Sequence, residues 1–217
     1  MARLLHLDAS TRWPGGPVPA PGPGVCARCH GPARDGAPEC WCCRRVGAVL
    51  GEAPGTGPPA TALALCRPGD ALHGALRRYK DAPAVEARRH HVALLGAMLS
   101  DFFAHGAEGL RAGHGAWQAV AVVPSSARGS ATTAPFMNVV DSVVSLRGTA
   151  RVALRRGPGR AGHLAPARDA FRLLGPPPDG GVLLLDDTWV TGARARSAAA
   201  NRVRQFLTGK YQRLRSV

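Results

Sequence analysis

The pattern of apolar and polar positions predicts a series of strands and helices from residue 60 onward. Short apolar runs predict strands at 61–66, 117–124, 152–154 and 182–187. Apolar residues spaced three and four positions apart predict helices at 69–80, 84–105, 135–146 and 193–207. Strands that alternate with helices favour a parallel sheet, because parallel strands need long crossover connections. We therefore expect an α/β fold with a parallel sheet and helices on both faces.

Proline and glycine interrupt the first 59 residues. The stretches WPGGPVPAPGPG at 13–24 and GEAPGTGPP at 51–59 predict no regular element. A cysteine-rich segment lies between them. We therefore predict three parts: a flexible segment at 1–24, a cysteine module with its linker at 25–59, and an α/β domain at 60–217.

The cysteines are spaced like metal ligands. Cys26 and Cys29 form one CxxC knuckle, and Cys40 and Cys43 form a second. Two such knuckles can offer four thiolates to one tetrahedral ion, which predicts structural zinc. Cys42 is an alternative to Cys40 or Cys43 as a ligand. Cys66 ends an apolar run and is expected to be a core thiol.

Two other interpretations of the cysteine segment stay open. Cys26 to His30 reads CARCH, which fits the CxxCH haem-attachment motif, although a second CxxC nearby favours a metal. Unliganded thiols are the remaining alternative.

Charge is unevenly distributed along the 217 residues. The chain has 28 basic and 14 acidic residues, a formal net charge of +14. From Arg147 to the end there are 14 basic and 4 acidic residues, a difference of +10. This last third is expected to attract phosphates, including those of nucleic acid, or to be a solvated arginine-rich surface.

No segment looks like a signal peptide or a membrane span. Asp8 interrupts the N-terminal leucines, and no apolar run approaches the roughly 20 residues of a membrane helix. We expect a cytoplasmic protein.

Two adjacent carboxylates, Asp186 and Asp187, follow the last predicted strand. Ligands of parallel sheets bind beyond the carboxyl ends of the strands, where this pair falls. The pair suits a ribose diol or a magnesium ion, and the N–H groups that open the next helix, at 191–193, suit a phosphate. The alternative is an acidic strand end that caps the helix.

The segment LLLDDTWVTGA resembles the phosphoribosyl pyrophosphate (PRPP) motif of type I phosphoribosyltransferases. The resemblance implies a Rossmann-like fold and a site that binds PRPP with Mg²⁺. It places the ribose on the acidic pair and the 5′-phosphate on the following loop. Arg194 stands where that family usually has Thr or Ser. The implied PRPP-binding residues are Asp186, Asp187, Thr188, Thr191, Gly192, Ala193 and Arg194.

A wider resemblance covers most of the chain. The four-cysteine module, RRYKD at 77–81, VVP at 122–124, APARDAFRL at 165–173 and the PRPP motif together are similar to the ComF family, which is linked to competence for DNA uptake. This resemblance implies a zinc-binding piece on a type I phosphoribosyltransferase domain. The loop after VVP is where phosphoribosyltransferases hold pyrophosphate, which suggests Ser125, Ser126 and Arg128. Here the chain reads SSARGSATTAPFMN in place of an RGFNQ-like segment.

Three functions follow as expectations. The first is transfer of a phosphoribosyl group from PRPP to an unknown acceptor. The second is a non-catalytic competence factor that binds single-stranded DNA or a partner protein through the arginine-rich surface. The third is a PRPP sensor. Weaker candidates for ligand contact are Tyr79, Lys80, Arg168 and Trp189.

Overall fold

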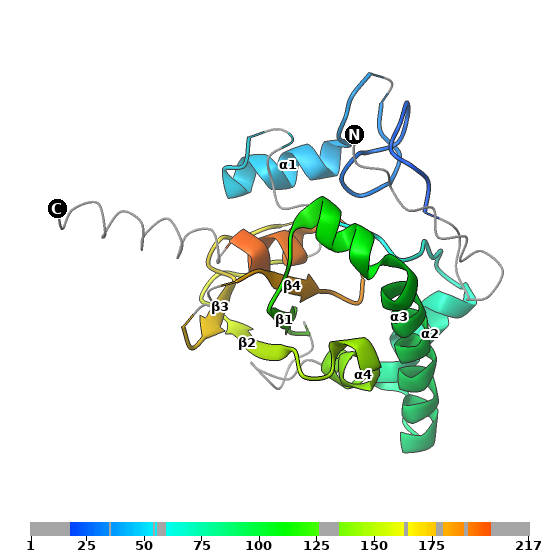
Figure 1. Ribbon diagram of the computed structural model, residues 1–217. Coiled ribbons are helices and arrows are strands. Elements are labelled where there is room, and N and C mark those ends of the chain that lie inside the picture. Colours follow the sequence, from blue (N-terminus) through cyan, green and yellow to red (C-terminus); the bar gives the residue numbers. More distant parts are fainter. Residues whose placement is uncertain are drawn as a thin grey trace.

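The computed structural model describes residues 18–34, 36–53, 55, 60–125, 135–162, 165–176, 180–188 and 191–200. The elements along this part of the chain are shown in Figure 1, with three helices before the first strand. They are α1 (Trp41–Leu50), α2 (Ala71–Asp81), α3 (Val85–His114), β1 (Ala119–Val122), α4 (Phe136–Ser142), the 3₁₀ turn η2 (Val144–Leu146), β2 (Ala150–Arg156), β3 (Phe171–Leu174) and β4 (Val182–Leu185). Residues 193–200 are helical. In the described part of the chain, no helix combines the length and apolarity needed to cross a membrane.

The four strands form one mixed sheet in the order β3-β2-β1-β4. β1 pairs in parallel with both β2 and β4, whereas β3 runs antiparallel to β2. The prediction of an all-parallel sheet is therefore wrong for β3, the strand at one edge. The described parts of the β2–β3 connection contain no helix, and without a crossover the returning strand pairs antiparallel.

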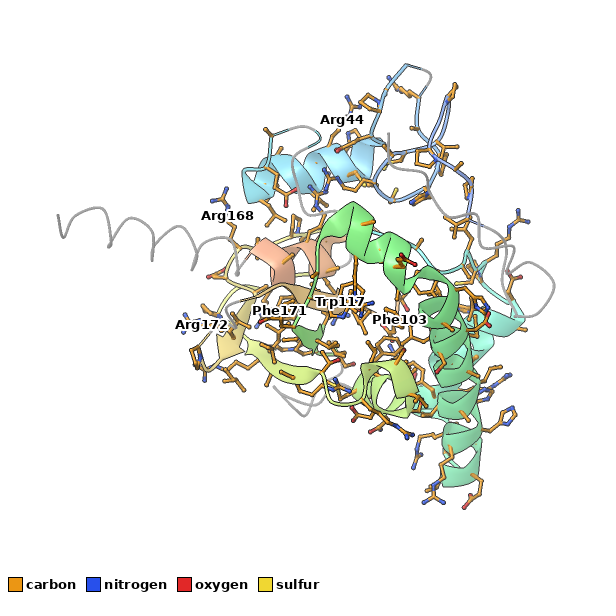
Figure 2. The ribbon with its side chains drawn as sticks, viewed as in Figure 1. Arg44, Phe103, Trp117, Arg168, Phe171 and Arg172 are labelled. Atoms are coloured by element: carbon orange, nitrogen blue, oxygen red, sulfur yellow. The ribbon has the colours of Figure 1, made fainter. Side chains whose placement is uncertain are left out.

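Helices lie on both faces of the sheet, as the pattern predicts. Val120 and Val122 of β1 point into a core shared with α2, α3 and α4. The alternate positions, Ala121 and Val123, point to the opposite face, where Ala198 of the helix at 193–200 packs. Figure 2 shows Phe103 of α3 and Phe171 of β3, which belong to these two separate cores.

Several predicted elements differ in extent from the observed ones. α2, β1 and β4 form where the pattern predicts them, while α3 continues nine residues beyond 105 to His114. The helix expected at 135–146 breaks at Val143, whose backbone is extended, so that α4 and η2 are separate. The end of the helix expected at 193–207 lies outside the described residues.

The strand expected at 61–66 does not form. Only Leu65 makes an isolated bridge, and its side chain is exposed. Leu63, Ala64 and Cys66 pack instead against the helical core layer. Within the described residues, the apolar run packs against this core and pairs with none of the four strands.

The cysteine module contains a helix that was not predicted, α1. Cys40 caps its start by accepting a hydrogen bond from the Cys43 N–H, and Gly51 ends it in the left-handed conformation at φ 65°. Val46 and Leu50 of α1 pack against Ala193. The module therefore lies on the helix that follows β4.

Candidate functional site

The acidic pair lies at the carboxyl edge of the parallel strands. Asp186 and Asp187 directly follow β4, and the last bond of this ladder joins the Val123 N–H to the Leu185 carbonyl at 3.0 Å. The ends of β1 and β4 therefore meet here. This is the edge at which open α/β sheets bind ligands.

Two side chains from the end of α2 reach Asp187. The Tyr79 hydroxyl donates a hydrogen bond to Oδ2 of Asp187, and the Lys80 ammonium forms an ion pair with the same oxygen. Tyr79 is 3% exposed, and its burial, reinforced by the charge of Asp187, raises its pKa above the usual value. The sequence suggested these residues only as weak candidates for a phosphate contact. The one signal for them was the RRYKD segment.

The other carboxylate, Asp186, titrates near neutrality. Burial, and then the charge of Asp187, raises its pKa to about 7, although Arg194 and Lys80 act in the opposite direction. The two carboxylates therefore differ in character. Asp187 is held in an ion pair, whereas Asp186 can hold a proton near pH 7.

The turn that opens the helix at 193–200 is closely constrained. Gly192 has φ 73°, a conformation that side chains disfavour. Oγ1 of the buried Thr191 accepts a hydrogen bond from the Ala193 N–H at 3.3 Å, and Ser197 Oγ donates to the Ala193 carbonyl at 2.6 Å. Trp189, proposed above as a ligand contact, lies outside the described residues.

Arginines hold the end of β1 beside this turn. Arg194 donates to the Pro124 carbonyl, and Arg156 donates to the Ser125 carbonyl. The guanidinium of Arg194 thus links the helix to the strand end and lies close enough to lower the pKa of Asp186. Ser126 and Arg128 of the expected pyrophosphate loop lie outside the described residues.

The remaining suggested residues lie at the periphery. Thr188 is exposed after the acidic pair. The guanidinium of Arg168 lies against Gly51 at the end of α1, and Figure 2 shows Arg168 beside this helix. Its side chain therefore contacts the cysteine module.

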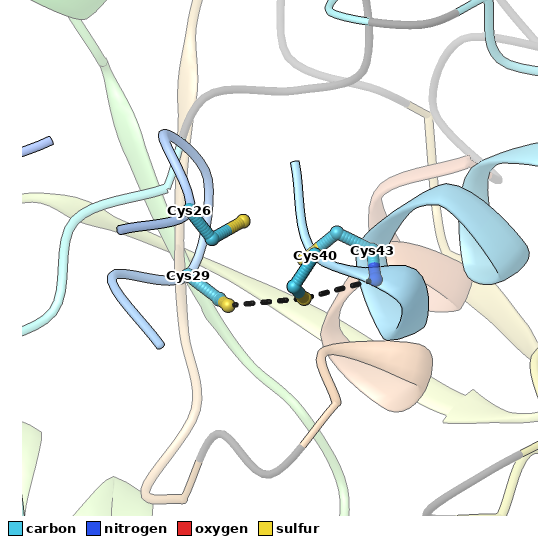
Figure 3. Close-up of side chains that lie close together, drawn as sticks. All are labelled: Cys26, Cys29, Cys40 and Cys43. Atoms are coloured by element: carbon cyan, nitrogen blue, oxygen red, sulfur yellow. Dashed lines mark hydrogen bonds between the residues drawn. The ribbon is translucent and has the colours of Figure 1, made fainter. Parts of the chain in front are cut away.

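The four predicted metal ligands come together (Figure 3). The ligand atoms of Cys26, Cys29, Cys40 and Cys43 all lie within 4.8 Å of one another, and the Sγ atoms of Cys29 and Cys40 are 3.7 Å apart. Such a set of soft ligands suits a tetrahedral structural metal such as zinc. Cys42 lies outside the group.

The surroundings of the cluster help to distinguish a metal site from a haem-attachment site. Nδ1 of the buried His30 lies 2.8 Å from the Pro19 carbonyl oxygen, and His30 does not belong to the sulfur group. Packing of both knuckles into one cluster favours a metal over attachment of haem to Cys26 and Cys29 alone. Cys66 packs on the main core, as expected.

Comparison of the chain with protein-family models, curated proteins and solved structures gives no match.

Proposed function

We propose that the chain binds a ribose 5-phosphate group, such as that of PRPP, at the carboxyl edge of β1 and β4. Support comes from one arrangement, in which the Asp186–Asp187 pair follows β4 and precedes a glycine turn that opens a helix. A diol-binding group and a phosphate-binding turn at one edge of the sheet match the two ends of this ligand.

Each part of the site has a defined task. The carboxylate oxygens of Asp186 and Asp187 accept hydrogen bonds from the ribose hydroxyls, and the helix start at 191–193 receives the 5′-phosphate. Mg²⁺ would enter with the pyrophosphate, whose charge it neutralises. Lys80 is a cation already at the site, and it is free to turn toward the same phosphates once ribose replaces it on Asp187.

The reaction that fits such a site is phosphoribosyl transfer. An acceptor nucleophile bonds to the anomeric carbon, and the bond from that carbon to the pyrophosphate oxygen breaks. The described groups position the ligand and stabilise the departing charge. In this proposal the chain has a type I phosphoribosyltransferase-like fold and is a ComF-like protein, with the acceptor unassigned.

Calorimetric titration with PRPP and Mg²⁺ tests the proposal. Asp187→Asn keeps the shape of the side chain and removes its charge, and should abolish measurable binding. Asp141→Asn is the matched control, since Asp141 pairs with Arg151 on the surface. Absence of binding to the unmodified protein, or equal binding to the Asp187→Asn variant, would overturn the proposal.

A second candidate function is nucleic-acid binding at the outer sheet edge. Arg155 of β2 and Arg172 of β3 are exposed and directly opposite each other in the antiparallel ladder. Like charges in this position repel, so an anion between them would be stabilising. Binding of single-stranded DNA that weakens steeply with salt, and is reduced in a double Arg155→Gln and Arg172→Gln variant, would support this function. Binding unaffected by that double variant would exclude this edge.

A further inference from the structure

A buried arginine joins the cysteine module to the helix of the proposed phosphate site. Arg196 lies one turn after Gly192, and its backbone N–H donates to the Gly192 carbonyl at 2.9 Å. Its side chain points away from the sheet and is 2% exposed. Nη1 donates to the main-chain carbonyl of Cys43 at 2.7 Å, and Nη2 forms an ion pair with Glu52.

The contact is closely packed on the module side. A methyl group added to Gly47 of α1 would lie 2.8 Å from Nη2 of Arg196. Val46 and Leu50, one position before and three positions after Gly47, pack against Ala193 in the phosphate-binding turn. One turn of α1, from Val46 to Leu50, thus contacts Ala193 at the start of the first helical turn after Gly192 and Arg196 at its end.

The partners of Arg196 depend on the cysteine cluster. Cys43 supplies one of the four sulfurs and, through its own carbonyl, one of the acceptors of the buried guanidinium. A buried charge that loses its partners carries a large desolvation cost. Any movement of α1 on loss of the metal therefore forces Arg196, and the helix that bears it, to rearrange.

We propose that Arg196 is a positioning residue that couples metal occupancy of the cysteine cluster to the phosphate-binding turn at 191–193. The metal, held by Cys43 and its neighbours, fixes α1. In turn α1 fixes Arg196, which holds Gly192 and Ala193 in the binding geometry. The inference rests on the proposed function for the identity of the ligand, but the coupling itself is testable without any ligand.

Amide hydrogen exchange of the ligand-free protein tests the coupling directly. Removal of zinc with a chelator should speed exchange at 191–197 about tenfold, while exchange at 120–122 in β1 stays unchanged. In the Arg196→Met variant, exchange at 191–197 should already be fast with zinc bound and should not respond to the chelator.

Gly47→Ala should act in the same direction with every other side chain retained, which covers the case that the arginine variant does not fold. Arg44→Met, an exposed change on the same helix, is the control and should behave as the unmodified protein.

Reciprocal binding supplies the second measurement. Zinc loading should tighten the binding of ribose 5-phosphate about tenfold. By thermodynamic linkage, ribose 5-phosphate should tighten the binding of zinc by the same factor, measured in equilibrium competition with a chelator. Gly47→Ala should reduce both factors together. Unchanged exchange at 191–197 on zinc removal, or an equal rise across β1, would overturn the coupling. Failure of ribose 5-phosphate to bind while the exchange response persists would overturn the proposed ligand alone.

Discussion

The Tyr79 hydroxyl donates a hydrogen bond to Asp187, a residue 108 positions later in the chain. The bond joins the end of α2 to the carboxyl edge of the sheet. Lys80 binds the same carboxylate oxygen, so that two consecutive residues of α2 share one acceptor. Asp187 is thus fixed in place before any ligand arrives.

Substitution of Tyr79 by Phe should weaken the fold measurably. The change removes only the hydroxyl, leaving Oδ2 of a half-buried carboxylate without one of its two partners. We expect the free energy of unfolding in urea to fall by about 1–3 kcal/mol. Ser145→Ala, a change at an exposed position of η2, is the control. Equal urea midpoints for the Tyr79 variant and the control would contradict the assigned bond.

The stability of the protein should fall as pH rises toward 7, because of Asp186. Its pKa is raised from 3.8 to about 7, so the folded state binds more protons than the unfolded state between these values. This contribution is fully present below pH 3.8 and is lost as pH rises through 7. The Asp186→Asn variant cannot titrate and should lack this component, which is on the order of 4 kcal/mol. The measurement is the difference in unfolding free energy between the two proteins at pH 5 and pH 8. A difference that does not depend on pH would refute the shifted pKa.

Removal of the Arg194 charge should move the titration of Asp186 to higher pH. Arg194 and Lys80 both lower the pKa of Asp186, against the larger effects of burial and Asp187. The Arg194→Met variant keeps most of the aliphatic stem and loses the favourable charge. Carbon-13 shifts of the Asp186 carboxyl group, followed over pH, report the midpoint directly. Arg172→Met, at the outer strand, should leave the midpoint where it is; an equal response to both variants would mean that general charge and not proximity sets the pKa.

The sequence predicted the parts of the fold whose signal is local. β1 and β4 are continuous apolar runs, and α2 carries Leu72, Leu76 and Tyr79 at helical spacing, so each has its own pattern. The segment at 61–66 is a short apolar run like that of a strand, but it packs on the core that the helices share with β1 and pairs with none of the four named strands. β3 was not predicted because it is only four residues long and Arg172 interrupts its apolar residues.

The candidate site also has one part that the local sequence predicts and another part that it does not. The acidic pair, the glycine turn and the cysteine spacing are contiguous motifs and were predicted from the chain alone. The partners that modify them come from distant segments. Lys80 on Asp187 and Arg196 on Cys43 depend on how α2 and α1 pack, which no local spacing encodes.

Metal content should distinguish two adjacent cysteines. Cys43 belongs to the sulfur cluster, whereas its neighbour Cys42 does not. We expect about one zinc ion per chain in the unmodified protein and in a Cys42→Ser variant, and little in a Cys43→Ser variant. Elemental analysis of protein purified without chelators gives the numbers. Zinc that is lost from the Cys42 variant and kept by the Cys43 variant would reassign the fourth ligand.

Substitution of Gly192 by Ala should affect both stability and ligand binding. The residue has φ 73°, and a Cβ in this left-handed conformation costs about 1–2 kcal/mol. Gly192 also precedes Ala193, whose N–H is held by Thr191, so relief of the strain would disturb the turn itself. We expect a lower unfolding free energy of this size and weaker binding of ribose 5-phosphate in the same variant. Gly148→Ala is the matched control, because Gly148 has φ 80° in the turn before β2, an added Cβ would meet no atom within 4 Å, and the residue is far along the chain from the turn at 191–193. It should show a similar loss of stability with unchanged binding. Equal loss of binding in both variants would indicate a general effect of stability, and the turn at 191–193 would then have no special role in holding phosphate.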